Sequence, residues 1–236
     1  MSKELVHHCA ICPSRLEGVF CELDGSQVEE LNGAKTTNQY KRGQVIFYEG
    51  NQPKGLFCVY RGKIKLFKTG DDGRETIIKV EGPGDILGYR SILTDEPYNL
   101  TAEVIEDAEV CFIDKHFFSG LIAKEPSIAL SVLRRLGHEL AIVQAQLSDV
   151  LSKSVRQRLS HLLLTLQKTH GQKQGNETFI DLRLTRTELA SMVGATPETV
   201  IRLLSDFSDS NYIRLDGKRI LIRNSGELLR EANIEV

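Results

Sequence analysis

The sequence lacks any apolar run that approaches the length of a membrane-spanning helix. Its N-terminus, MSKELVHHCAIC, also lacks the apolar stretch of a secretory signal peptide. We therefore expect a soluble, cytoplasmic protein with no membrane partner. We find neither a nucleophile and base arrangement nor a phosphate-binding loop, and these absences argue against an enzyme.

An excess of charge of one sign is also missing, because 30 Lys and Arg residues against 32 Asp and Glu residues give a formal net charge of -2. The charge is nevertheless unevenly distributed. Residues 152–223 contain 12 basic and 7 acidic residues, a local balance of +5 that leaves -7 for the remainder. The basic charge is thus concentrated in the C-terminal third.

Residues 44–114 consist of short β-type runs separated by glycine or Asp-Gly turns. The runs are VIFYEG, LFCVY, KIKLF, ETIIKV, LTAEVI and EVCFI. Short strands at such close and regular spacing are typical of a compact antiparallel barrel or roll. The sequence therefore predicts an all-β domain in this half of the chain.

The segment that follows, residues 126–151, predicts one long helix with a narrow apolar stripe. The apolar residues recur at alternating steps of three and four, the spacing of a coiled-coil seam. They are Leu133, Leu136, Leu140, Val143, Leu147 and Val150. Such a stripe can pack on the core of its own domain or pair with a second copy of the chain, and the spacing alone leaves both possibilities open.

The C-terminal third predicts a winged helix. Residues 185–188 fit a capping box that begins one short helix, and Thr196 before Pro197 begins the next. Residues 212–222 then alternate between apolar and basic on both sides of an Asp-Gly pair, which predicts a hairpin. The polar segment 167–179, which precedes this unit, is expected to be a loop.

Two charged residues on the second short helix are suited to reading DNA bases. Glu198 and Arg202 are four residues apart and share a face near the end of the helix that enters the major groove in this motif. Arginine can donate two hydrogen bonds to guanine, and glutamate can accept one from cytosine. An ordinary intrahelical ion pair is the alternative. Candidate phosphate contacts flank this helix or lie on the hairpin: Thr196, Arg186, Lys218 and Arg219.

Residues 184–222, LTRTELASMVGATPETVIRLLSDFSDSNYIRLDGKRILI, resemble the DNA-binding domain of the CRP/FNR family of bacterial transcription regulators. The β-domain, the long helix and the winged helix also follow that family's order. The resemblance implies an α+β fold with an N-terminal β-roll of the cyclic-nucleotide-binding type, a long dimerisation helix and a C-terminal winged helix-turn-helix. The implied segments are a cysteine-bearing segment (1–24), a sensor domain (25–124), the dimerisation helix (125–151) and the DNA-binding domain (152–236).

The resemblance also implies partners. Family dimers bind two-fold symmetric sites, so the apolar stripe becomes the dimer interface, and the pair Glu198 and Arg202 is expected to read the G·C pairs of a TGA core. The implied partners are double-stranded DNA, a second copy of the chain and RNA polymerase. Arg134, Arg135 and Glu139 lie near the stripe and are expected to oppose pairing until the sensor favours it.

The sensor does not resemble the cyclic-AMP-binding branch of the family. That branch places a glutamate after the glycine of its phosphate cassette and an Arg-Ser pair further on. This chain has Tyr89 after Gly88, and Tyr98 and Asn99 after Pro97. Tyrosine and asparagine cannot supply the charge that a buried anionic phosphate requires, which argues against cyclic AMP as the effector.

The cysteines suggest a different signal. Cys9 and Cys12 have the C-x2-C spacing that lets two thiolates reach one metal, and Cys21 follows. Cys111 occupies the place that resembles the cluster-ligating cysteine of FNR proteins, whereas Cys58 is expected to be a small buried hydrophobe. We predict an oxygen-labile [4Fe-4S] cluster on Cys9, Cys12, Cys21 and Cys111. A zinc site, a metal-free thiol switch, and an unidentified ligand of the β-roll remain alternatives.

Overall fold

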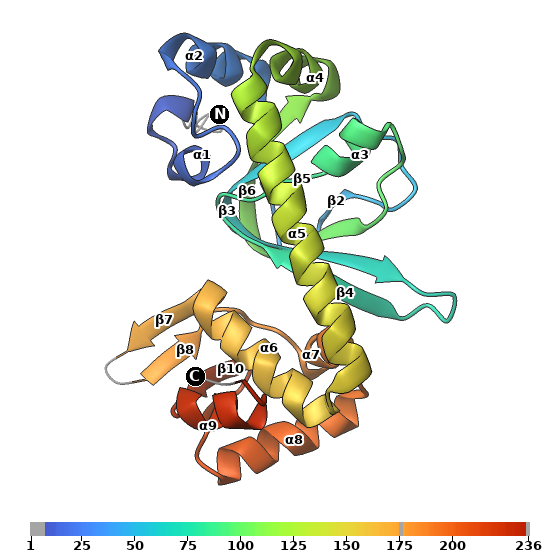
Figure 1. Ribbon diagram of the computed structural model, residues 1–236, viewed down its shortest axis with the longest axis vertical. Helices are drawn as coiled ribbons and strands as arrows, with labels where there is room; N and C mark the ends of the chain where they lie inside the picture. The colour runs from blue at the N-terminus through green and yellow to red at the C-terminus, as the bar shows by residue number, and fades with distance from the viewer. Residues whose placement is uncertain (1–7, 175–176, 235–236) are drawn as a thin grey trace. The chain divides into compact units, whose positions relative to one another are not determined.

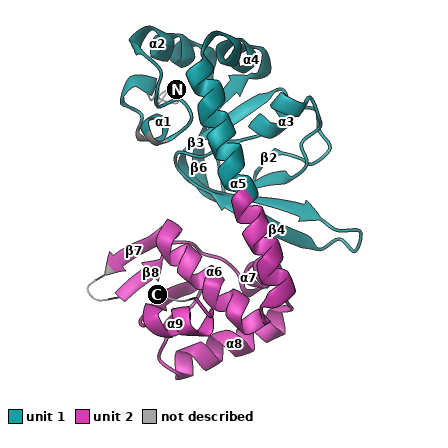
Figure 2. Ribbon diagram, in the orientation of Figure 1, with its two compact units in different colours: residues 1–140 teal, residues 141–236 magenta. Residues whose placement is uncertain are grey.

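The chain divides into two compact units, residues 1–140 and 141–236 (Figure 2). The computed structural model describes residues 8–174 and 177–234. The division falls within helix α5 (Pro126–Ser152), so the predicted long helix is confirmed to within one residue, while the predicted boundaries at residues 124 and 151 stay predictions. No helix in the described ranges is both long and apolar enough to cross a membrane.

The first unit contains the predicted antiparallel β-domain (Figure 1). Its main sheet has the strand order β1-β6-β3-β4, with β2 paired to β6 and β5 paired to β3. The strands are β1 (Lys35–Tyr40), β2 (Val45–Phe47), β3 (Gly55–Thr69), β4 (Glu75–Glu81), β5 (Ile86–Leu87) and β6 (Thr101–Asp114). Four of the predicted short runs merge pairwise into the two long strands β3 and β6.

The merging is possible because the pairing of β3 with β6 tolerates register shifts between Val59 and Ile64. Gly62 lies at this irregularity with a φ of +90°. A Cβ atom there would come within 2.5 Å of the backbone of Ala108 on β6, so only glycine fits. The glycine that the sequence predicts as a turn between two strands, Gly62, is therefore part of a bulge inside the continuous strand β3.

Short helices and an N-terminal segment pack against this sheet. They are η1 (Cys9–Ile11), α1 (Pro13–Glu17), α2 (Gly25–Ala34), α3 (Tyr89–Thr94) and α4 (Lys115–Lys124). Val19, Phe20 and Leu23 are buried, and the ring of Phe20 meets that of Phe118 edge to face at 6.2 Å. The N-terminal segment, which has little apolar surface of its own, is thus ordered by the core of the β-domain.

The second unit is the predicted winged helix. After α6 (Val155–His170), the two short helices are α7 (Arg186–Val193) and α8 (Pro197–Asp209), and the wing is β9 (Ile213–Asp216) with β10 (Arg219–Ile222), followed by α9 (Ser225–Glu231). The capping box at Thr185 is present. Gly194 ends α7 in the left-handed conformation, which explains a glycine at this turn.

The segment predicted as a loop, residues 167–179, differs from the prediction. Helix α6 ends at His170, and the residues after it form β7 (Gly171–Gln174) and β8 (Glu177–Ile180) where a loop is predicted. Strand β8 pairs with β10, so the wing becomes part of a four-stranded sheet with the order β7-β8-β10-β9. Strand β7 pairs with β8, and β8 receives its other hydrogen bonds from the distant strand β10, which local composition does not reveal.

Candidate functional site

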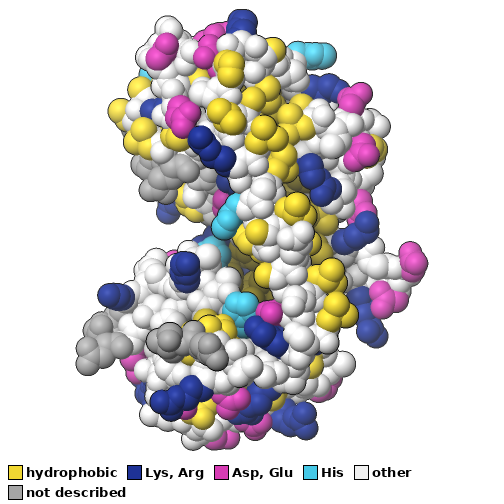
Figure 3. Space-filling model, viewed as in Figure 1, with side chains coloured by type: hydrophobic (Ala, Val, Ile, Leu, Met, Phe, Trp, Pro, Cys, Tyr) yellow, Lys and Arg dark blue, Asp and Glu magenta, His cyan; other side chains and the backbone are white. Residues whose placement is uncertain are grey.

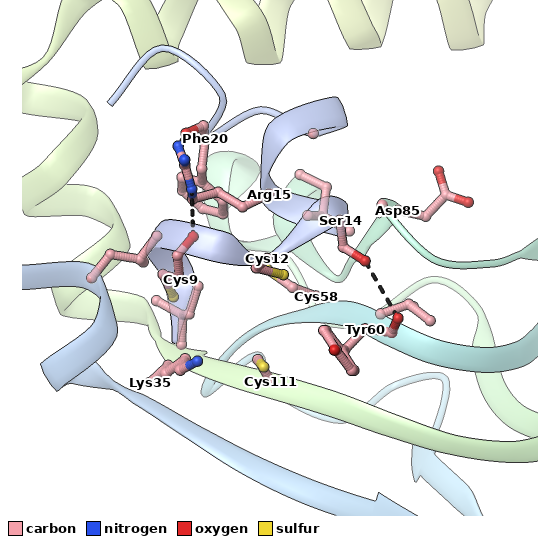
Figure 4. A pocket seen from close by; sticks show the side chains of 16 residues that line it. Cys9, Cys12, Ser14, Arg15, Phe20, Lys35, Cys58, Tyr60, Asp85 and Cys111 are labelled. Atoms are coloured by element: carbon pink, nitrogen blue, oxygen red, sulfur yellow. Dashed lines mark hydrogen bonds between the residues drawn. The ribbon is translucent and has the colours of Figure 1, made fainter. Parts of the chain in front are cut away.

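Four cysteines line one cavity in the first unit (Figure 4). Cys9 and Cys12 enter it from the N-terminal segment, while Cys58 lies on β3 and Cys111 on β6. Cys9, Cys12 and Cys111 belong to the predicted ligand set, so the structure brings three of its four members to the same cavity. The other cysteine of the cavity, Cys58, is one that the sequence did not assign to the site.

The N-terminal part of the cavity is held by hydrogen bonds to neighbouring elements. The backbone N–H of Cys9 donates to Asn32 Oδ1 on α2 at 3.0 Å, and Arg15 Nε donates to the carbonyl of Cys9 at 2.7 Å. The hydroxyl of Ser14 on α1 donates to the carbonyl of Tyr60 on β3 at 3.3 Å. These contacts fix the turn that carries the C-x2-C pair beside the sheet.

The sheet presents its two cysteines as a cross-strand pair. Cys58 and Cys111 are directly opposite each other in the antiparallel pairing of β3 and β6, so both side chains lie on the same face. Thr37 is opposite Cys111 on the other neighbour, β1, and its hydroxyl lies 3.6 Å from the Cys111 sulfur. Lys35, also on β1, lines the cavity. Two thiols, a hydroxyl and an ammonium group are therefore gathered on one sheet face.

Cys21, the fourth member of the predicted set, is exposed and does not line this cavity. Its backbone carbonyl accepts a hydrogen bond from Arg15 Nη1 at 3.5 Å. The same nitrogen donates to the carbonyl of Phe20 at 3.0 Å. The ligand role of Cys21 stays a prediction.

Burial controls the protonation of the cavity thiols. It raises the pKa of Cys9 and of Cys111, and it raises the pKa of Cys58 well above the usual range of a thiol. Lys35 acts in the opposite direction on Cys9. Within the described ranges, no three side chains of His, Cys, Asp or Glu are placed to hold one metal ion. Metal binding therefore requires the thiols to lose their protons and their sulfur atoms to turn into the cavity.

A buried charge network adjoins the cavity. Asp85 lines the cavity, and its Oδ1 accepts a hydrogen bond from Arg135 Nη2 on α5 at 2.8 Å. Glu81 is buried, with its Oε1 2.6 Å from Lys79 Nζ and 3.7 Å from Arg135 Nη2. Lys79 also reaches Glu139 Oε1 on α5 at 3.0 Å. Burial, and then the neighbouring Asp85, raise the pKa of Glu81 to about 8.

This network corrects an expectation from the sequence. Arg135 and Glu139 were expected to lie near the apolar stripe and to oppose pairing, but both form ion pairs with the β-domain of their own chain. Arg134, by contrast, is well exposed and lies 3.6 Å from Glu22. The i,i+4 spacing of Arg135 and Glu139 indicates a shared helix face, but it does not indicate which strand residues meet that face.

Aromatic side chains occupy the positions at which the cyclic-AMP-binding branch has charged residues. Tyr98 is buried, its ring stacks on Phe47 at 4.0 Å between centroids, and its hydroxyl donates to the carbonyl of Gly55 at 2.8 Å. Tyr89 is also buried, and its hydroxyl donates to Glu139 Oε2 at 2.9 Å. Neither position offers a cation to a phosphate.

The apolar stripe of α5 is largely exposed (Figure 3). Five of its six predicted residues are between 53% and 61% exposed: Leu133, Leu140, Val143, Leu147 and Val150. The sixth, Leu136, packs against the core of the first unit together with the buried residues Ile128 and Val132 of the same helix. Core packing within the first unit therefore accounts for Leu136 and a neighbouring face of the helix, while the other five stripe residues stay exposed among the described residues.

Helix α8 has one buried and one exposed face. Its buried residues are Val200, Leu203, Leu204 and Phe207. Glu198, Ile201, Arg202 and Ser205 are exposed. Within the described chain, no ion pair joins Glu198 to Arg202. The pKa of Glu198 is lowered by a backbone N–H at the helix start and by the Thr196 hydroxyl, so its carboxylate is charged at neutral pH.

The four predicted phosphate contacts occupy different settings. Thr196 is exposed and caps α8, accepting a hydrogen bond from the N–H of Thr199 at 3.3 Å. Lys218 and Arg219 are exposed at the turn of the wing. Arg186 is partly buried, and its Nη2 donates to the carbonyl of Gly217 at 3.2 Å. Arg186 thus joins α7 to the wing, and contacts of all four residues with DNA stay predictions.

Comparisons with known proteins agree with this division of the chain. Residues 37–125 match the cyclic nucleotide-binding domain family, and residues 157–231 match the Crp-like helix-turn-helix domain family. The chain is 32% identical over 215 residues to the CRP-like cAMP-activated global transcriptional regulator of Mycobacterium tuberculosis, covering 91% of this chain and 96% of that protein. It is 26% identical to the fumarate and nitrate reduction regulatory protein of Vibrio cholerae, covering 96% and 91%.

The fold has close counterparts among solved structures. FixK2 from Bradyrhizobium japonicum superposes with a TM-score of 0.75 at 21% identity, covering 86% of this chain and 99% of FixK2. Its sequence identity is too low to carry more than the fold. The M. tuberculosis relative matches nearly the whole chain, and this similarity together with the helix-turn-helix family match identifies the protein as a transcription regulator rather than an enzyme. The chain belongs to the CRP/FNR family of DNA-binding transcription regulators.

Proposed function

We propose that this regulator responds to oxygen or redox state through a [4Fe-4S] cluster bound at the cysteine cavity, with Cys9, Cys12 and Cys111 as three of its ligands. The observation that carries the proposal is the convergence of these cysteines, 102 positions apart at the extremes, on one cavity. Thiolates are the ligands that iron-sulfur clusters require. The bound cluster supplies a group that oxygen can dismantle, and the protein supplies the thiols and the shielded cavity.

The proposal does not extend the effector named for the M. tuberculosis relative, cAMP, to this chain. A cyclic phosphate buried in the β-domain needs a positive partner. Tyr98 is instead stacked on Phe47 and hydrogen-bonded to the backbone, and Tyr89 is hydrogen-bonded to a carboxylate. Both hydroxyls already have partners, so neither is available to balance a phosphate charge.

We further propose a homodimer that pairs along the exposed stripe of α5. A contiguous apolar stripe with heptad spacing is costly to leave in water, and a second copy of the same helix is its natural cover. Two winged helices brought together in this way can engage a two-fold symmetric site on double-stranded DNA. RNA polymerase is the expected protein partner, and the cytoplasm is the expected compartment.

On the DNA, Glu198 and Arg202 are proposed to read the G·C pairs of a TGA-type core. They share the exposed face of α8 and have no ion pair with each other within the described chain. The guanidinium of Arg202 can therefore donate to a base edge, and the Glu198 carboxylate, which also accepts from a backbone N–H and from Thr196, keeps further acceptor positions. Thr196, Arg186, Lys218 and Arg219 are proposed to contact phosphates. Of these, Arg186 has the least freedom, because the wing already accepts one of its hydrogen bonds.

The cluster is tested by isolating the full-length protein without air. We expect a brown protein with about four iron and four sulfide ions per chain. Brief exposure to air should remove both and weaken binding to a TGA-containing site. Colourless, iron-free protein that binds this DNA at full strength in air would falsify the proposal.

The DNA contact is tested with Arg202→Ala. Loss of a bidentate base contact should cost about 1–3 kcal/mol of discrimination between the specific site and random DNA, while weak, salt-sensitive binding persists. Lys218→Ala is the control, because removing a phosphate contact should weaken binding equally on both DNAs. Affinities measured over a salt series separate the two behaviours. An equal loss on both DNAs for Arg202→Ala would argue against a base contact.

A further inference from the structure

The cavity contains one thiol that the proposed cluster does not use. Cys58 lines the same cavity as Cys9, Cys12 and Cys111, whereas the exposed Cys21 does not. We infer that Cys58, in place of Cys21, is the fourth thiol ligand of the metal centre. This inference rests on the proposed function for the cluster, although the four-thiol site also suits a single thiophilic cation such as Zn²⁺.

The sheet places Cys58 close enough to Cys111 for both sulfur atoms to bind one metal ion. It is directly opposite Cys111 in the β3–β6 pairing, and the Cβ atoms of directly opposed residues are about 4.5–5.5 Å apart. A tetrahedral metal with sulfur atoms at about 2.3 Å holds two sulfurs about 4 Å apart. Rotation of the two side chains can span that difference, so the two strands need not move.

The site then consists of two pairs. Cys9 and Cys12 form a C-x2-C pair on the turn that Arg15 and Asn32 hold, and Cys58 with Cys111 forms the cross-strand pair. C-x2-C pairs recur in four-cysteine metal sites because one turn lets both sulfurs approach the same ion.

Cys21 lacks such access. Its neighbour Phe20 is buried against Phe118, and Leu23 is also buried. These two residues fix the backbone on either side of Cys21 while its own side chain is exposed. To turn the Cys21 sulfur into the cavity, the segment would have to withdraw Phe20 from the core, which costs apolar burial. Cys58 requires no such withdrawal.

The lining of the cavity also balances the charge. Four thiolates on one divalent ion carry a net charge of about -2, and an anion in an apolar cavity needs a positive neighbour. Lys35 and Arg15 both line the cavity, and the carboxylate of its lining, Asp85, is already paired with Arg135. Either a metal ion or a cluster with four thiolates would therefore meet cationic side chains at its edge.

The test uses full-length, reduced protein without air and Co²⁺ as the probe. Co²⁺ bound to four thiolates gives sulfur-to-metal charge-transfer absorption that grows with the number of bound sulfurs. Wild type and the matched control Cys21→Ser should bind one Co²⁺ with equal affinity and equal absorption. Cys58→Ser should bind on the order of tenfold more weakly or worse, with absorption reduced by about a quarter.

A second variant, Cys58→Ala, guards against a folding defect of the serine variant, and circular dichroism verifies that each variant is folded. Reconstitution with Fe²⁺ and sulfide then tests the cluster separately. If Cys21→Ser loses metal and both Cys58 variants bind it normally, the inference is overturned while the proposed cluster stands. If Cys58 is needed for Co²⁺ but wild type takes up no iron and sulfide, the inference stands and the proposed cluster is overturned. Wild type that binds neither metal overturns both.

Discussion

The two halves of helix α5 are held in opposite ways. Up to residue 140, the helix is fixed to its own β-domain by buried apolar residues and by ion pairs from Arg135 and Glu139. Beyond residue 140, its apolar residues Val143, Leu147 and Val150 are more than half exposed. The first half is therefore fixed to the β-domain, while the second half has an apolar face that stays exposed in the described part of the chain. The proposed dimer would cover that face with a second copy of the same helix.

Removing the charge that holds the first half should have the largest effect. Arg135→Ala leaves Asp85 without its cation and removes the more distant of the two cations beside the buried Glu81, which keeps Lys79. Breaking a buried ion pair from one side costs about 3 kcal/mol or more. Chemical denaturation of the full chain should show the loss as a lower transition midpoint. Arg134→Ala is the control, because its exposed ion pair with Glu22 contributes about 0.5 kcal/mol or less. Equal effects of the two substitutions would show that the network does not fix the helix.

A charge on the second half should act on assembly and leave folding intact. Leu147→Glu places a carboxylate within the proposed dimer seam, and we expect the dimer dissociation constant to rise by about tenfold or more. Gln146→Glu adds the same charge one position away and should change it little. Analytical ultracentrifugation measures both. If Leu147→Glu dimerises as well as wild type, the exposed stripe is not the interface.

The smallest expected effect concerns the pH dependence of stability, which tests the buried charge network that holds the first half of α5. The pKa of Glu81 is raised from 4.5 to about 8 in the folded chain, so the folded state holds a proton that the unfolded state has lost. This contribution is fully present below about pH 4.5 and is lost as the pH rises through about 8. Between pH 7 and pH 9 we expect the free energy of unfolding to fall by about 1 kcal/mol.

Glu81→Gln should flatten that dependence, because an amide has no proton to lose. Glu96→Gln, at an exposed position of the same domain, is the control and should retain the slope. The measurement is the denaturation midpoint of wild type and both variants across this pH range. An unchanged slope in Glu81→Gln would assign the titration to another group.

The elements of the fold were predictable where the signal is local. The capping residues Thr185 and Thr196, the heptad spacing of α5 and the apolar alternation of the strands each act within a few residues, and the structure has those elements. The hairpin β7–β8 was missed because β8 is stabilised by pairing with β10, whose residues lie 40 to 44 positions further along the chain. Its polar sequence contains no sign of that partner.

In the candidate site, too, the residues with a local sequence signal were predictable and those placed by distant contacts were not. The C-x2-C pair can be recognised from its spacing, and Cys111 from a family resemblance. The place of Cys58 depends on the register of β3 against β6, which the bulges between Val59 and Ile64 adjust and which no local pattern specifies. The partners of Arg135 depend on tertiary packing in the same way. What the sequence could not provide was therefore the set of contacts between elements.

Asp85 takes part in two sites: it lines the thiol cavity, and its carboxylate accepts the hydrogen bond from Arg135 that fixes α5. A change in the charge of the cavity would therefore act directly on the hydrogen bond between Asp85 and Arg135 that fixes α5. In the proposed sensor, the group that receives the signal is thus distinct from the contact that would transmit it. An engineer could replace the cysteines with another charge-changing receptor in the same cavity and keep the contact between Asp85 and Arg135.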